Sequence, residues 1–201
     1  MMTAEPRVPR RPMRSHARRN YEHLLAQARA AFAEQGINAS LEDIARAAGV
    51  GIGTLYRHFP TRQALLEVLL HDSFNDLETQ ARNLIKADPP GEALASWLRI
   101  LAAHAATYRG LAEALMSTLR DERSALYASC QALHAAGDQL LARAQEAGEA
   151  RADLDSWELF TLANAMAWAS EQRPGTADHT DRFLSLLYEG LRPGMSHTIS
   201  P

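Results

Sequence analysis

Apolar side chains recur at helical spacing along most of this chain. In the segment that begins near His16, Tyr21, Leu24, Ala28 and Phe32 lie three or four positions apart, which makes one face of a helix apolar. No stretch alternates like a strand for more than a few residues. The sequence therefore predicts an all-α fold with helices over residues 16–35, 40–48, 52–59, 61–87, 92–107, 111–119, 122–146, 155–171 and 179–191.

Residues 40–59 predict a helix, a tight turn and a second, short helix. Ser40 can cap the first helix, and Gly49 stands where that helix must end, because glycine adopts a positive φ at little cost. Leu55 and Phe59 lie one turn apart and are expected to face inward. Helix, glycine turn and crossing helix are the parts of a helix-turn-helix DNA-binding motif.

The outward side of the second helix carries the residues that can contact DNA. Gly53, Thr54 and Arg57 fall roughly opposite the apolar face, with Tyr56 and His58 on the flanks. Hydroxyl and imidazole groups can bind phosphates, and an arginine can reach a phosphate or a guanine edge. These positions predict a recognition helix for a major groove.

The run GVGIGTLYRHFPTRQALL resembles the DNA-binding signature of the TetR/AcrR family of bacterial transcriptional regulators. The resemblance covers about the first third of the chain, and Gly51 departs from the capping serine of many members. The matching positions are Gly49, Val50, Leu55, Tyr56, His58, Phe59, Thr61 and Arg62. The resemblance implies a three-helix head in which DNA is bound by Ile52, Gly53, Thr54, Tyr56, Arg57, His58 and Arg62.

The resemblance also implies that the remaining helices enclose an effector cavity and form a dimer interface. For each of these residues, packing within the chain's own core is the alternative. The candidate cavity residues are Trp97, His104, Met116, Leu119, Tyr127, Cys130, His134, Phe160 and Asn164. The candidate interface residues, on helices that are apolar on more than one face, are Trp157, Met166, Phe183 and Leu187.

Charge is distributed unevenly along the chain. The net charge is −3, but residues 1–62 hold ten arginines and five acids, whereas residues 63–201 have a net charge of −8. A basic segment on an acidic body is typical of a local DNA-binding surface. We expect a flexible basic arm over residues 1–15, either contacting DNA or without a fixed contact. A helix-turn-helix domain is expected over 16–62, an effector-binding and dimerisation domain over 63–195 and a tail over 196–201.

Other functions find little support in the sequence. The glycines near position 51 do not form GxGxxG, and HExxH, GxxxxGK[ST] and GxSxG are all missing, so we expect no enzyme, metal or cofactor. The single cysteine, Cys130, cannot form an internal disulfide. No apolar run approaches the roughly 20 residues of a membrane span, and no apolar segment follows the N-terminal arginines. A cytoplasmic protein is expected.

The resemblance implies a homodimeric, ligand-responsive regulator, which in this family is most often a repressor. Its expected partners are a palindromic double-stranded DNA operator, a small-molecule effector and a second copy of the chain. One alternative is a DNA-binding regulator without a small-molecule effector. The other is a helical enzyme in which the helix-turn-helix pattern is accidental.

Overall fold

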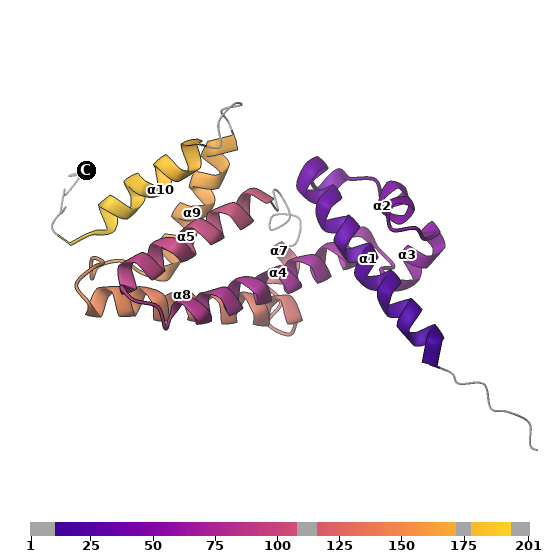
Figure 1. Cartoon of the computed structure of the whole chain (residues 1–201), viewed down its shortest axis with the longest axis horizontal. Coiled ribbons are helices and arrows are strands. Elements are labelled where there is room, and N and C mark those ends of the chain that lie inside the picture. The colour runs from indigo at the N-terminus through magenta and orange to yellow at the C-terminus, as the bar shows by residue number, and fades with distance from the viewer. Residues whose placement is uncertain (1–10, 108–115, 172–177, 194–201) are drawn as a thin grey trace, which may run out of the picture. The chain divides into compact units, whose positions relative to one another are not determined.

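The structure is a computed structural model that describes residues 11–107, 116–171 and 178–193. Side chains are not described at a few positions inside these ranges, Met116 among them. The predicted all-α fold is confirmed, and no strand occurs in the described ranges. The chain forms two compact units (Figure 1), with unit 1 ending at Leu66 and unit 2 beginning at Glu67.

The described part of unit 1 contains three α-helices, a short 3-10 helix, η1 (Gly36–Asn38), and the first turn of a fourth α-helix. The α-helices are α1 (Arg11–Gln35), α2 (Leu41–Ala47), α3 (Ile52–His58) and the start of α4 (Arg62–Leu84). The predicted boundary at residue 62 differs slightly from the division at Leu66, because the buried Leu65 and Leu66 belong to unit 1. The core is formed by side chains from every element, including Leu24, Phe32, Ile44, Leu55 and Phe59.

The first helix begins earlier than the sequence predicts. It starts at Arg11 rather than near His16, so the expectation of a flexible arm is wrong for residues 11–15. Pro12 falls in the first turn of α1, where the backbone N–H groups have no intrahelical acceptor and a proline is tolerated. Residues 1–10, the rest of the predicted arm, lie outside the described residues, and so does the whole of the predicted tail.

The turn between α2 and α3 follows its sequence signals. The Ser40 side chain accepts a hydrogen bond from the backbone N–H of Asp43 at 3.2 Å and so caps α2. Gly49 adopts φ +71°, and the Val50 N–H then donates to the Ala45 carbonyl at 3.0 Å. This left-handed residue ends α2 and turns the chain into α3. The positive φ predicted for Gly49 is thereby confirmed.

Unit 2 is a helical bundle around α5. Its helices after α4 are α5 (Pro90–Thr107), α7 (Met116–Leu119), α8 (Ala125–Glu146), α9 (Ser156–Glu171) and α10 (Asp178–Leu191). The central helix, α5, packs against α8, α9 and α10 (Figure 1). None of the helices in the described ranges is long and apolar enough to cross a membrane.

Two helix ends in unit 2 differ by three residues from the predicted ones. α4 ends at Leu84 rather than near residue 87, and α8 begins at Ala125 rather than 122. The reason for the second difference is that Ser124 caps α8, accepting from the Tyr127 N–H at 2.9 Å. Of the predicted helix over 111–119, the structure describes only Met116–Leu119.

Gly137 is required where α8 crosses the core of unit 2. A Cβ atom at this position would lie 2.7 Å from Cη2 of Trp97 and 3.0 Å from Cε2 of Phe160. Both rings are tightly packed, with Trp97 0% and Phe160 7% exposed, so neither can move aside freely.

We expect Gly137→Ala to lower the free energy of unfolding by about 1–3 kcal/mol, since overpacking outweighs the higher helix propensity of alanine. Gly190→Ala in α10 is the matched control, because its Cβ would meet nothing within 4 Å. That variant should be neutral or stabilised by up to about 1 kcal/mol. Urea denaturation of the two variants measures the difference, and equal stabilities would contradict the packing argument.

Candidate DNA-binding surface and effector cavity

The outward face of α3 is formed by Gly53, Tyr56 and Arg57. These positions are spaced i, i+3 and i+4, and all three residues are exposed, Tyr56 by 45%. Leu55 and Phe59 are buried on the opposite side, as predicted. Arg57 forms no ion pair or hydrogen bond within the described part of the chain. The face therefore presents one unpaired cation and one phenol.

The other predicted DNA contacts on α3 are only half-exposed. Ile52, Thr54 and His58 are each partly buried. The His58 ring packs edge-on against Tyr21 of α1 at a centroid distance of 5.5 Å, and Tyr21 stacks on Phe59 at 5.4 Å. These ring contacts fix the end of α3 on α1. Tyr21, which the sequence placed only in the apolar stripe of α1, is thus a residue that positions α3.

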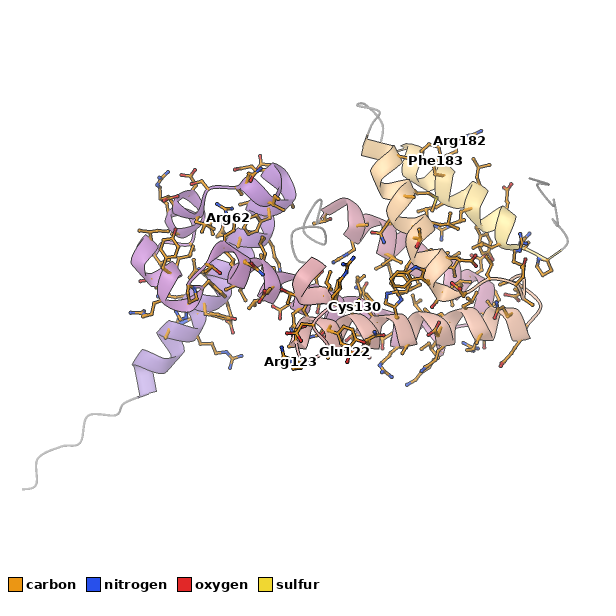
Figure 2. The ribbon with its side chains drawn as sticks, turned by 180° about the vertical axis from the view of Figure 1, so that it is seen from behind. Arg62, Glu122, Arg123, Cys130, Arg182 and Phe183 are labelled. Carbon is orange, nitrogen blue, oxygen red and sulfur yellow. The ribbon has the colours of Figure 1, made fainter. Side chains whose placement is uncertain are left out.

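Arg62 does not lie where the sequence placed it. The prediction put its side chain toward the DNA backbone, but it lies inside unit 1 (Figure 2). Its Nη1 donates to the carbonyl oxygens of Ile37 at 2.9 Å and Ala39 at 2.6 Å. The guanidinium carbon lies 5.9 Å from the centre of the Phe32 ring. Arg62 thus joins the start of α4 to the segment between α1 and α2.

Unit 2 contains a cavity of about 370 Å³. Of the predicted cavity residues, the structure brings together His104, Leu119, Cys130, His134, Phe160 and Asn164. The sequence missed the other lining residues, Leu70, Phe74, Leu77, Leu101, Ala105, Leu133, Trp157 and Thr161. The first three belong to the apolar stripe of α4, and that stripe was the available signal.

Two predicted cavity residues lie elsewhere. Tyr127 is half-buried outside the lining. Trp97 is fully buried and packs edge-on against Phe160 at 5.1 Å, so it supports the cavity wall from behind. The Trp97 Nε1 atom has no hydrogen-bond partner among the described residues. The Met116 side chain lies outside the described part of the chain, so its predicted place in the cavity stays a prediction.

The ionisable groups of the cavity are held in their uncharged forms. Burial lowers the pKa of His104 to about 4, and its Nε2 hydrogen-bonds with Oγ of the buried Ser73. Burial also lowers the pKa of His134, although the negative charge of the nearby Asp138 carboxylate partly offsets this shift. Burial raises the pKa of the Cys130 thiol. Among the described residues, the lining contains no Lys, Arg, Asp or Glu. These lining residues therefore carry no net charge at neutral pH.

The pKa of His104 predicts a pH dependence of stability. Between pH 6.5 and 4 the unfolded chain binds a proton that the folded chain excludes, so this contribution is complete above pH 6.5 and decreases as the pH falls. We expect the free energy of unfolding to fall by about 2 kcal/mol when the pH is lowered from 7 to 5, because the unfolded chain then binds a proton at His104. Urea titrations of wild type and His104→Gln at both pH values test this. The loss on acidification should be smaller in the variant, and equal losses would contradict the prediction.

The predicted dimer residues do not share one exposed face. Trp157 is 68% exposed but lines the cavity. Met166 and Leu187 pack against the core of their own unit, and packing within the chain was the alternative left open by the sequence. Phe183 on α10 is half-buried (Figure 2). Two large apolar side chains that were not among the predicted interface residues are exposed instead, Leu162 on α9 by 39% and Leu186 on α10 by 53%.

A three-helix head with an exposed third helix, followed by a helical bundle with an apolar cavity, is the architecture of a helix-turn-helix transcriptional regulator. Residues 24–69 match the family described as bacterial regulatory proteins, tetR family. Residues 89–193 match the family described as transcriptional regulator SbtR-like, C-terminal domain. The chain belongs to the TetR family of bacterial transcriptional regulators, which confirms the resemblance seen in the sequence. The members of this family are regulators of transcription rather than enzymes.

Individual relatives agree with this assignment. A TetR transcriptional regulator from Streptomyces coelicolor, known from a crystal structure, is 38% identical in sequence to this chain. The two structures superpose over 86% of this chain and 98% of the relative, with a TM-score of 0.67. A TetR regulatory protein from Mycobacterium vanbaalenii is 37% identical over 90% of this chain and 99% of its own, with a TM-score of 0.65. The transcriptional repressor KstR2 of Rhodococcus jostii is 27% identical over 84% of this chain and 89% of its own.

Proposed function

We propose that this regulator is a ligand-responsive repressor that binds a palindromic operator as a homodimer in the cytoplasm. The observation that carries the DNA-binding part is the exposed face of α3, with Arg57 unpaired among the described residues. A relative described as a repressor, KstR2, supports the direction of regulation.

Each copy would place α3 in a major groove. A groove about 12 Å wide admits a helix, and Gly53 would allow the backbone of α3 to approach the bases closely. Arg57 would bind a guanine edge or a phosphate, and Tyr56 would bind a phosphate. Ile52, Thr54 and His58 would contact DNA from the sides of the helix. Two copies related by two-fold symmetry would bind half-sites about one helical turn, or a multiple of it, apart.

Ligand response is supported by the residues that line the cavity. Leu70, Phe74 and Leu77 of α4 form part of its wall, and the first turn of α4 belongs to unit 1. A ligand that shifts α4 would therefore act on the same helix that completes the DNA-binding unit. To switch the protein strongly, the ligand must distinguish the two states by a few kcal/mol.

The experiment that tests this function is selection of bound genomic DNA fragments with purified protein at two salt concentrations. We expect enrichment of one palindromic sequence that persists at the higher salt. Weak binding without a common sequence, falling steeply with salt, would show that unit 1 binds only phosphates. Sedimentation of the protein with the selected DNA measures the stoichiometry, and one chain per palindrome would contradict the homodimer.

A further inference from the structure

We infer that the cavity of unit 2 takes an uncharged, compact aromatic compound that donates one hydrogen bond. This inference names the effector class and rests on the ligand response proposed above. It is carried by the chemistry of the lining, by the arrangement of its rings and by one amide side chain at its opening.

The described lining residues offer no partner to an ionised ligand. Among them, no Lys or Arg is present to bind an anion, and no Asp or Glu is present to bind a cation. Two histidines line the cavity, and the ring of His104 hydrogen-bonds with Ser73. The surroundings also disfavour anions, since residues 63–201 have a net charge of −8. A charged ligand would lose its hydration without gaining a counterion.

The rings of the lining favour a flat ligand. His134 stacks on Trp157 at a centroid distance of 5.1 Å with an angle of 21° between the planes, and it lies 3.9 Å from Phe160. Phe74 and His104 also line the cavity, with a distance of 6.2 Å between the centres of their rings. Aromatic rings gain from offset or edge-to-face contact with such walls, beyond the area that they bury.

Polar groups gather where α9 borders the cavity. Trp157, Thr161 and Asn164 lie at i, i+4 and i+7 on α9, and all three are exposed, so they form the opening. The Asn164 Nδ2 group donates to the Phe160 carbonyl at 2.8 Å, which leaves the amide oxygen as an acceptor. A ligand hydroxyl or N–H group would satisfy that oxygen.

The volume limits the ligand to a compact molecule. The cavity of about 370 Å³ is at the small end of ligand sites and equals the volume of about a dozen waters. Its inner wall is apolar and buried, with Leu77 and Leu133 each 2% exposed. The ring system would occupy this inner part, and the donor group would face Asn164.

Calorimetry with four naphthalene derivatives tests the inference on the full-length protein at pH 7. They are naphthalene, 2-naphthol, 2-naphthoate and 2-naphthylmethylamine, which share one ring system and differ in charge and hydrogen bonding. We expect 2-naphthol to bind most tightly, naphthalene about fivefold more weakly, and the two ions about 100-fold more weakly. An ion that binds as tightly as 2-naphthol, or no binding by any of the four, would overturn the inference.

Two variants at the opening locate the binding. Asn164→Leu should bring the affinities of 2-naphthol and naphthalene to about the same value, while Gln131→Leu, an exposed amide outside the lining, should keep the roughly fivefold difference. Thr161→Trp should block the opening and abolish binding. Unchanged 2-naphthol binding in Thr161→Trp or Asn164→Leu would place the ligand elsewhere and overturn the inference.

Operator binding, measured in parallel, separates this inference from the proposed function. If 2-naphthol binds with the expected preference but leaves operator affinity unchanged, the ligand class stands and the proposed ligand response fails. If 2-naphthoate binds tightly and releases the operator, the ligand response stands and the ligand class fails.

Discussion

Replacing Arg57 with alanine is expected to weaken operator binding by about 30-fold or more. An arginine that binds a guanine edge contributes about 1–3 kcal/mol, and a homodimer loses this contribution twice. Stability should change by no more than about 0.5 kcal/mol, because Arg57 is exposed and has no hydrogen bond or ion pair among the described residues. Fluorescence anisotropy with the selected operator measures the affinity, and urea denaturation measures the stability.

Arg99→Ala is the matched control for Arg57→Ala. Arg99 is also an exposed arginine, but it lies on α5 in unit 2, so its loss changes net charge without touching α3. We expect operator affinity to change less than about twofold in this variant. A similar loss of affinity in both variants would show that α3 contributes only charge.

The salt dependence of Arg57→Ala distinguishes the two contacts that this residue can make. If Arg57 binds phosphate, each copy of the chain releases about one counterion fewer, and the salt slope falls by about two for the dimer. If Arg57 binds a base, the salt slope is largely unchanged, and the variant loses its preference at one position of each half-site.

The DNA-binding head could be predicted closely because its signals are local. The Ser40 cap, the positive φ of Gly49 and the buried pair Leu55 and Phe59 each depend on residues a few positions apart. Such signals fix a short segment regardless of the rest of the chain. The sequence predicts a later start for α1 because several prolines favour an arm, although Pro12 suits the first turn of a helix.

The cavity could be predicted only in part because helical spacing does not say which neighbour a face meets. His134 and Phe160 face the cavity, whereas Trp97, on an equally apolar helix, packs behind its wall. Met166 and Leu187 were assigned to a dimer interface for the same reason, and both cover the core of their own unit. The lining from α4 was missed because the apolar stripe of this helix predicts a buried face but not the cavity that the face borders.

Arg62→Ala is expected to destabilise unit 1 by about 2–4 kcal/mol. The variant loses two charge-assisted hydrogen bonds, to the Ile37 and Ala39 carbonyls, and a ring contact with Phe32. Hydrogen bonds to charged groups contribute about 1.5–3 kcal/mol, and Ala39 is 1% exposed, so little water can replace the lost donor at its carbonyl. Arg62→Lys should be intermediate, because an ammonium group keeps the charge but not the planar guanidinium.

Native-state hydrogen exchange by mass spectrometry measures this effect in each unit. Peptides from α2 and α3 should exchange about 30-fold to 1,000-fold faster in Arg62→Ala, whereas peptides from α8 should be unchanged. Operator affinity would then fall because α3 is ordered for less of the time, and high concentrations of operator DNA should restore slow exchange. If Arg62 instead bound DNA phosphate, exchange in the free protein would be unchanged and the salt slope of binding would fall. The two variants therefore separate the proposed operator contact, Arg57, from Arg62, which holds unit 1 together.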